Sequence, residues 1–222
     1  MSLLHPLRLA WGLPQAAAHY RADRLSSDDA HRASHPRSAR AQADWEVSRA
    51  LLHASRAATA SSPCAESLSH SRQHAVVAHA MPGWRLGIDL ECVRPRRVLD
   101  LAEWTCCAGE IAWLRAEADP QCRLRRFYIL WTLKEAFIKA AGLSFPADLC
   151  LYGLDQTPGA SLSLRAPLGV WHARTYAMGA GWIASVVWSP AGAGGGEEPQ
   201  WAAGPASALP LIKVLGRWTA GA

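Results

Sequence analysis

The chain has 222 residues, 50% of them hydrophobic, so it is long enough to bury a sizeable core as one large domain or two small ones. Its formal net charge of +5 suits an anionic partner. It contains neither a basic run interleaved with aromatic residues nor a long unbroken apolar stretch, so we expect no nucleic-acid binding and no membrane span.

The N-terminal part predicts a strand and two helices. Residues 7–11 alternate between apolar and polar side chains, which is typical of a strand. Ser26 or Ser27 precedes two aspartates, as expected of a helix N-cap with acids in the first turn. Apolar residues recur with helical spacing over residues 38–59, which predicts an amphipathic helix that stops at residues 61–63.

The middle of the chain predicts a β-hairpin. Residues 75–80 are apolar and partly β-branched, which indicates a buried strand. A Pro-Gly pair at residues 82–83 marks a turn, and residues 84–91 then form the partner strand. The two acids of this second strand share one face, because strand side chains alternate.

Helices and a second hairpin are expected next. Residues 98–118 have a helical pattern in one or two pieces, and residues 122–141 form a clear helix ended by Gly142 as a C-cap. Two runs rich in β-branched and aromatic residues, 170–177 and 181–188, predict the hairpin.

This order of elements predicts an α+β protein with two similar halves related by a pseudo-twofold, each a small antiparallel sheet packed on a long helix. The halves would comprise residues 1–84 and 85–190. Gly, Ala and Pro are frequent in residues 191–222, which predicts a flexible tail with a short apolar end at residues 211–218.

The cysteines and the N-terminus indicate an intracellular protein. None of the six cysteines forms a C-x-x-C pair, so we expect reduced thiols rather than a zinc site or a disulfide framework. The first residues have no basic start and no unbroken apolar run, so they do not resemble a signal peptide, and the expected location is cytoplasmic.

Two segments about forty residues apart carry the candidate chemistry. The strand contains Asp89 and Glu91 on one face, and the helix contains Glu135. Three carboxylates that converge in space make a site for a hard cation such as Mg²⁺. The chain has only three lysines, and two of them, Lys134 and Lys139, lie in this helix, which suggests a phosphate ligand on the metal.

Each of these patterns also has a simpler interpretation. Asp89 and Glu91 could line the solvated side of an edge hairpin. Glu135 and Lys139 are four residues apart and could form an ordinary exposed ion pair, worth about 0.3–0.5 kcal/mol. The helix around them is so apolar, however, that few positions are left for water, which favours a site.

Two further positions are candidates. His70 lies between Ser69 and Ser71, where a turn would offer hydroxyls, an imidazole and backbone N–H groups to an anion. A lone histidine is more often structural, and a serine nucleophile with an adjacent histidine base is disfavoured because neighbours rarely reach the needed geometry. Glu110 lies in the predicted helical region, where the pattern alone favours a side chain that faces solvent.

Together these segments resemble the 4′-phosphopantetheinyl transferase superfamily, most closely its surfactin-synthetase-activating type. Residues 67–71 look like the family's asparagine-x-serine-histidine-serine turn, with Ser67 where asparagine is usual. Residues 87–91 look like its glycine-aliphatic-aspartate-aliphatic-glutamate strand, and residues 127–139 look like its F-x-x-x-W-(S/T)-x-K-E-(A/S)-x-x-K helix. The three motifs occur in order, and the resemblance covers about residues 40–190.

The resemblance implies an enzyme that moves the phosphopantetheine arm of coenzyme A to a serine of an acyl or peptidyl carrier protein and releases adenosine 3′,5′-bisphosphate. Its implied cofactor is Mg²⁺, which would bind the pyrophosphate and be held by Asp89, Glu91 and Glu135. A single chain that contains both halves fits a monomer.

The remaining implied roles concern coenzyme A and catalysis. Lys139 would neutralise charge on the pyrophosphate, Lys134 would contact substrate or stabilise its helix, and Glu110 falls where some members place a general base. The implied contacts to coenzyme A are Ser69, His70, Ser71, Lys139 and a basic residue of the N-terminal half, for which Arg49 is chosen among Arg32, Arg37, Arg40 and Arg49.

Three departures from the family pattern keep alternatives open. The N-terminal half is short, the asparagine of the turn is missing, and the tail has no counterpart. The chain could therefore be an inactive member that binds carrier proteins or coenzyme A, or another Mg²⁺-dependent phosphate enzyme such as a hydrolase. A nucleic-acid-binding module is the weakest alternative.

Overall fold

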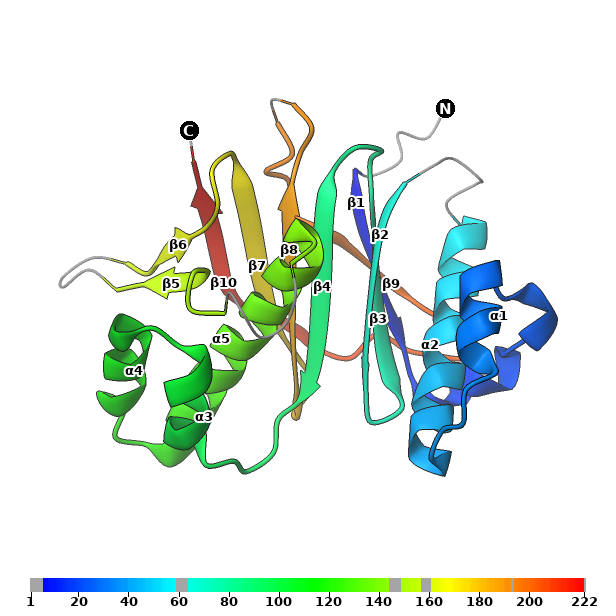
Figure 1. Ribbon diagram of the computed structural model, residues 1–222, viewed down its shortest axis with the longest axis horizontal. Helices are drawn as coiled ribbons and strands as arrows, with labels where there is room; N and C mark the ends of the chain where they lie inside the picture. Colours follow the sequence, from blue (N-terminus) through cyan, green and yellow to red (C-terminus); the bar gives the residue numbers. More distant parts are fainter. Residues whose placement is uncertain (1–5, 59–63, 144–148, 157–160, 193, 222) are drawn as a thin grey trace.

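The computed structural model describes residues 6–58, 64–143, 149–156, 161–192 and 194–221 (Figure 1). Two short 3-10 helices, Pro14–His19 and Ala22–Arg24, follow the first strand. The helices and strands are β1 (Leu7–Gly12), α1 (Ser27–Ala33), α2 (Ala39–Ala58), β2 (Ala65–Ser71), β3 (His74–Ala80), β4 (Arg85–Cys92), α3 (Val98–Thr105), α4 (Ala108–Arg115), α5 (Pro120–Ala141), β5 (Gly153–Asp155), β6 (Ser163–Arg165), β7 (Trp171–Met178), β8 (Trp182–Ser189), β9 (Gln200–Ala203) and β10 (Ile212–Ala220).

The described ranges form a mixed α/β fold, with two four-stranded sheets and a small hairpin. The first sheet has the order β2-β3-β1-β9, the second has the order β10-β7-β8-β4, and β5 pairs with β6. All of these pairings are antiparallel except β1 with β9, which is parallel, so the first sheet is mixed. Helix α2 lies on the outer side of the first sheet and α5 on the outer side of the second (Figure 1).

One hydrophobic core lies between the two sheets. Leu9 and Trp11 of β1 pack there with Ile88 of β4 and with Val186 and Trp188 of β8, and each of these five side chains is at most 1% exposed. Apolar residues alternate on these strands, so the other faces remain for the helices. Burial of large aliphatic and aromatic side chains on both sides of a sheet is the main source of stability here.

Local sequence signals explain where α2 begins and where α5 begins and ends. In α2, Ser38 Oγ accepts a hydrogen bond from the Ala41 backbone N–H at 3.2 Å, which satisfies one of the unpaired amides of the first turn. In α5, Asp119 is the N-cap and Pro120 is at the first position, and Gly142 ends the helix in the left-handed conformation at φ 66°.

Most of the expected elements are confirmed. The first strand, the N-cap at Ser26, the amphipathic helix, the hairpin formed by β7 and β8 and the helix ended by Gly142 are all present. The helical pattern of residues 98–118 corresponds to two pieces, α3 and α4. The predicted stop at residues 61–63 lies outside the described residues.

The predicted hairpin of residues 75–80 and 84–91 is wrong. Strand β3 pairs with β1 and β2, whereas β4 pairs with β8, so the two consecutive strands belong to different sheets. The turn signal at residues 82–83 was correct, since a turn does follow β3. A turn signal fixes a change of direction but does not decide which sheet the next strand joins.

The motif at residues 67–71 is not a turn. It is part of β2, an edge strand paired with β3, and the reversal comes after it at Arg72 and Gln73. Both of these residues have positive φ, 47° and 61°, as a two-residue hairpin turn of type I′ requires. The Gln73 backbone N–H donates to the Asp44 carboxylate, which stabilises this unusual backbone.

The expectation of a flexible tail is also wrong. Within residues 191–222, β9 joins the first sheet beside β1, and β10 joins the second sheet beside β7. Composition alone predicted flexibility because it does not reveal pairing with distant strands. The proposed boundary between the halves at residues 84 and 85 stays a prediction. No helix in the described ranges is long and apolar enough to cross a membrane.

Candidate active site

The predicted acids lie near one another where β4 packs against α5. Gly87, Asp89 and Glu91 share the face of β4 that α5 covers. The two elements approach so closely at Gly87 that an added Cβ would lie 1.9 Å from the carbonyl oxygen of Ala136. Glycine at this position therefore lets the helix place Glu135, the residue before Ala136, beside the acids of the strand.

Asp89 is the most constrained acid of the site. Its side chain is 8% exposed, and its Oδ1 atom accepts hydrogen bonds from Ser69 Oγ at 2.8 Å and from Lys139 Nζ at 2.9 Å. Lys139 Nζ also donates to the backbone oxygen of Ile88 at 2.9 Å, so this lysine ties α5 to β4. The other carboxylate atom, Asp89 Oδ2, is buried and has no hydrogen-bond partner among the described residues.

Glu91 and Glu135 are held in surroundings that oppose their negative charge. Burial raises the pKa of Glu91, and the nearby Asp89 carboxylate raises it further. Burial and then Asp89 also raise the pKa of Glu135, and Glu91 adds to the effect, although Lys139 opposes it. Three carboxylates therefore repel one another across β4 and α5, and Lys139 only partly compensates them.

These observations bear on whether the three acids could hold a cation. Among the described residues no three His, Cys, Asp or Glu side chains already stand in a metal-binding arrangement, so side chains would have to move for an ion to bind. The buried, unpartnered Asp89 Oδ2 and the raised pKa values of both glutamates indicate uncompensated negative charge, and a carboxylate donor set suits Mg²⁺. The residues present therefore fit this ion.

A cationic region lies next to the acids. His70 reaches the surface from β2, and loss of hydration on its enclosed side lowers its pKa, as do the charges of Arg49 and Lys139. Arg49 binds Asp29 at 2.9 Å and stacks on Trp45 at 4.0 Å, with Arg37 over the same ring at 4.1 Å. The structure thus brings His70, Arg49 and Lys139 into one electrostatic neighbourhood.

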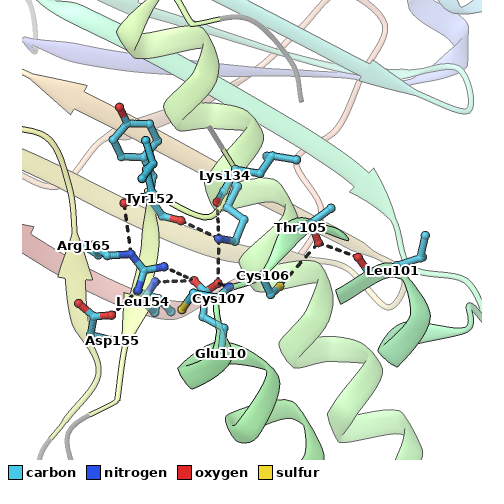
Figure 2. Close-up of polar contacts among 12 residues, drawn as sticks. Leu101, Thr105, Cys106, Cys107, Glu110, Lys134, Tyr152, Leu154, Asp155 and Arg165 are labelled. Carbon is cyan, nitrogen blue, oxygen red and sulfur yellow. Dashed lines mark hydrogen bonds and ion pairs between the residues drawn. The ribbon is translucent and has the colours of Figure 1, made fainter. Parts of the chain in front are cut away.

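Glu110 belongs to a separate cluster (Figure 2). It is 1% exposed and binds Lys134 at 2.8 Å and Arg165 at 3.1 Å. Lys134, itself 1% exposed, also donates to the backbone oxygens of Leu149 and Tyr152 at 2.6 Å each. The side chain of Lys134 points away from the face of α5 that carries Glu135 and Lys139, so the structure does not bring Glu110 to the three acids.

Both carboxylate oxygens of Glu110 are already used. Oε2 accepts from the backbone N–H of Cys107, and Oε1 accepts from the backbone N–H of Leu154, at 3.0 and 3.1 Å. A fully buried and fully bonded glutamate cannot reach a substrate, so this geometry gives no support to its expected role as a general base. It also contradicts the solvent-facing position that the pattern favoured.

The hydroxyl groups of two expected phosphate contacts are engaged elsewhere. Ser69 Oγ donates to Asp89 and Ser71 Oγ donates to Glu91 at 3.3 Å. This arrangement was not predicted from the sequence. Serines at alternate positions, which share one face of a strand, were the available signal, but they carried no information while the segment was interpreted as a turn.

Fold and site together define an α/β protein with an acidic, phosphate-compatible site between a strand and a long helix. Residues 85–187 match the family model of the 4′-phosphopantetheinyl transferase superfamily. The match covers β4, α5, β7 and most of β8, and it supports a phosphopantetheine transferase function. A comparison with curated proteins finds no match.

Proposed function

We propose that this protein transfers the 4′-phosphopantetheine arm of coenzyme A to a serine hydroxyl of an acyl or peptidyl carrier protein, in a Mg²⁺-dependent reaction that releases adenosine 3′,5′-bisphosphate. The observation that carries the proposal is the convergence of Asp89, Glu91, Glu135 and Lys139 on facing elements inside the superfamily domain. The proposed location is cytoplasmic and the proposed state is a monomer.

In the proposed reaction the serine oxygen bonds to the β-phosphorus of coenzyme A, and the bond from that phosphorus to the bridging oxygen breaks. When bound, Mg²⁺ would offset charge on the phosphate oxygens and lower the pKa of a hydroxyl. Asp89, Glu91 and Glu135 would hold the ion, and Lys139 would stabilise charge on the departing phosphate. The serine proton passes to solvent, so the mechanism needs no strong protein base.

The cationic neighbourhood supports a binding site for the phosphates of coenzyme A. His70 has hydrogen-bonding nitrogens near the surface, and Arg49 and Arg37 supply permanent charge beside the Trp45 ring. We assign the 3′-phosphate to this region, with Arg49 as its cationic anchor. Arg49 Nε is buried and has no hydrogen-bond partner in the described part of the chain, as expected for a donor reserved for an anion.

We also propose the surfactin-synthetase-activating type, with two related halves in one chain. Each four-stranded sheet carries one long helix on its outer side, α2 on the first and α5 on the second. The matched residues 85–187 include α5 and most of the second sheet but no strand of the first. The first unit would then be a diverged copy that lost the acids and kept the cationic region.

The direct test measures the intact mass of an apo carrier protein after incubation with this protein, coenzyme A and Mg²⁺. The expected result is a mass gain of one phosphopantetheine arm that disappears when a chelator is added. No gain across fatty-acid, polyketide and peptide carriers would contradict the proposal and favour an inactive binding module. Free phosphopantetheine released without any carrier would favour a hydrolase instead.

A further inference from the structure

Strands β2 and β4 are edge strands of different sheets that lie beside each other, and side chains rather than backbone pairing connect them in the described structure (Figure 1). Three serines of β2, at alternate positions on one face, each contact β4. We call them the serine ladder: Ser67, Ser69 and Ser71.

The three rungs of the ladder bind different kinds of partner. Ser67 Oγ accepts a hydrogen bond from the backbone N–H of Ile88 at 3.0 Å, so the first rung holds only the backbone of β4. The next rungs, Ser69 and Ser71, instead donate to the carboxylates of Asp89 and Glu91. Serine therefore has two kinds of partner along β2. Ser67 binds the backbone of β4, whereas Ser69 and Ser71 bind the two proposed metal ligands of that strand.

The contact at Asp89 fixes the direction of its free oxygen. Oδ1 is held by Ser69 from β2 and by Lys139 from α5, on two different elements. Because a carboxylate is planar, restraining Oδ1 also fixes the position of Oδ2, the buried atom without a partner. A lysine side chain has several rotatable bonds and holds a direction poorly by itself, whereas Ser69 is short and 7% exposed.

We propose that Ser69 is a positioning residue that presents Asp89 Oδ2 to the metal, and that Ser71 does the same more weakly for Glu91. This inference rests on the proposed function, because it concerns the same ion. Hydrogen bonds to a ligating carboxylate from outside the coordination shell orient it and affect metal affinity by about 10- to 100-fold. The first sheet would thereby contribute to an ion that no residue of that sheet binds directly.

The ladder also accounts for Ser67 at the position where the resembled motif usually has asparagine. The rung needs an acceptor oxygen for the Ile88 amide, and both a serine hydroxyl and an asparagine carboxamide supply one. Serine at position 67 therefore keeps the hydrogen bond that connects the two sheets and leaves Asp89 and Glu91 unaffected.

The test compares Mn²⁺ binding by calorimetric titration of the full-length chain, well below the unfolding temperature of every variant. We expect Ser69→Ala to weaken Mn²⁺ binding by about 10- to 100-fold, Ser71→Ala to weaken it less, and Ser69→Thr, which keeps the hydroxyl, to bind like the unaltered protein. Ser67→Ala is the matched control: it should lower the melting temperature and leave Mn²⁺ affinity unchanged.

The outcomes separate this inference from the proposed function. If the unaltered chain binds Mn²⁺ but Ser69→Ala binds it equally well, the positioning role is wrong and the proposed function stands. If Ser67→Ala and Ser69→Ala weaken Mn²⁺ binding equally, the serine ladder acts only by holding β2 against β4, and the inference is again overturned. An unaltered chain that binds no divalent ion would overturn the metal site and the inference together.

Discussion

At the scale of single residues, the acids of the candidate site oppose stability. Asp89, Glu91 and Glu135 repel one another in a partly buried region, where Lys139 is the one cation among the described residues that makes a direct ion pair with them. Strained electrostatics of this kind commonly mark functional sites, because a protein selected only for stability would replace one of the acids.

Glu135→Gln should separate function from stability. Removing this charge relieves the repulsion from Asp89 and Glu91, so we expect the metal-free protein to gain about 0.5–2 kcal/mol in its free energy of unfolding. Transfer to a carrier protein should fall by at least about 100-fold, since one ligand and its charge are lost. Denaturant unfolding and the mass assay would check both. A variant with unchanged transfer would contradict the three-carboxylate site.

The same variant gives a pH prediction. The pKa of Glu135 is raised above its ordinary 4.5 in the folded protein, so the folded state binds more protons than the unfolded state above that pH. The contribution of Glu135 to stability is therefore fully present below about pH 4.5 and is lost as pH rises through its raised pKa. The stability difference between Glu135→Gln and the unaltered protein should be near zero at low pH and grow as pH rises.

Comparing the two proteins removes the contribution of the histidines. Burial lowers the pKa of His70, His79 and His172, which makes stability rise with pH in the opposite sense. That effect is common to both proteins and cancels in the difference. A difference that stayed constant with pH in metal-free buffer would show that Glu135 is not electrostatically strained.

At the scale of elements, the close approach of β4 and α5 sets the position of the site. Gly87→Ala would place a methyl group against the backbone of Ala136, which cannot move without displacing the helix. We expect a loss of about 1–3 kcal/mol in stability from overpacking and a clear loss of Mn²⁺ affinity. Gly181→Ala is the control, because an added Cβ there meets nothing within 4 Å. Equal behaviour of the two variants would argue against the close approach.

The cluster around Glu110 joins α4, α5 and the segment before β5. Glu110→Gln removes the partner of Lys134, whose charge would then be buried without compensation, so we expect a loss of about 3–5 kcal/mol in stability. Transfer activity per folded molecule should be retained. Glu103→Gln is the control, because its pair with Arg115 is exposed and should matter little.

The outcome for Glu110 decides between two roles. A melting temperature close to that of the unaltered protein, together with a large fall in turnover, would restore the general-base role that the resemblance implied. The expected result, low stability with normal turnover at low temperature, would identify Glu110 as a purely structural residue.

Elements determined by local signals could be predicted from the sequence, and elements determined by distant partners could not. Helix α5 has a proline at its start, a glycine at its end and a long run of largely apolar residues between them, all of which are local. The polar strand β2 and the small-residue strand β9 gain their stability from neighbours far along the chain, so their own sequences resemble loops. The acids of the site were found by spacing, whereas the serines facing them depended on the arrangement of two sheets.

At the scale of the whole molecule, the C-terminal segment connects the two sheets. Strand β9 lies beside β1, and the Gly204 backbone N–H donates to the Trp11 carbonyl oxygen at 2.7 Å. Farther along the chain, β10 covers the edge of β7. The carboxylate of Glu198, just before β9, accepts hydrogen bonds from Arg174 of β7 and Arg217 of β10 at 3.1 Å each. The segment that composition marks as a tail therefore completes both sheets.

Removing residues 199–222 should consequently destabilise the entire chain. The truncation exposes the edges of β1 and β7, whose side chains are almost all buried, and unpaired edges promote association. We expect loss of most of a free energy of unfolding that is about 5–15 kcal/mol for a typical domain, with aggregation visible by light scattering. Lys213→Ala, an exposed change within β10, serves as the control and should unfold like the unaltered protein. A truncated chain that stayed monodisperse with an unchanged melting temperature would show that the segment is an appendage.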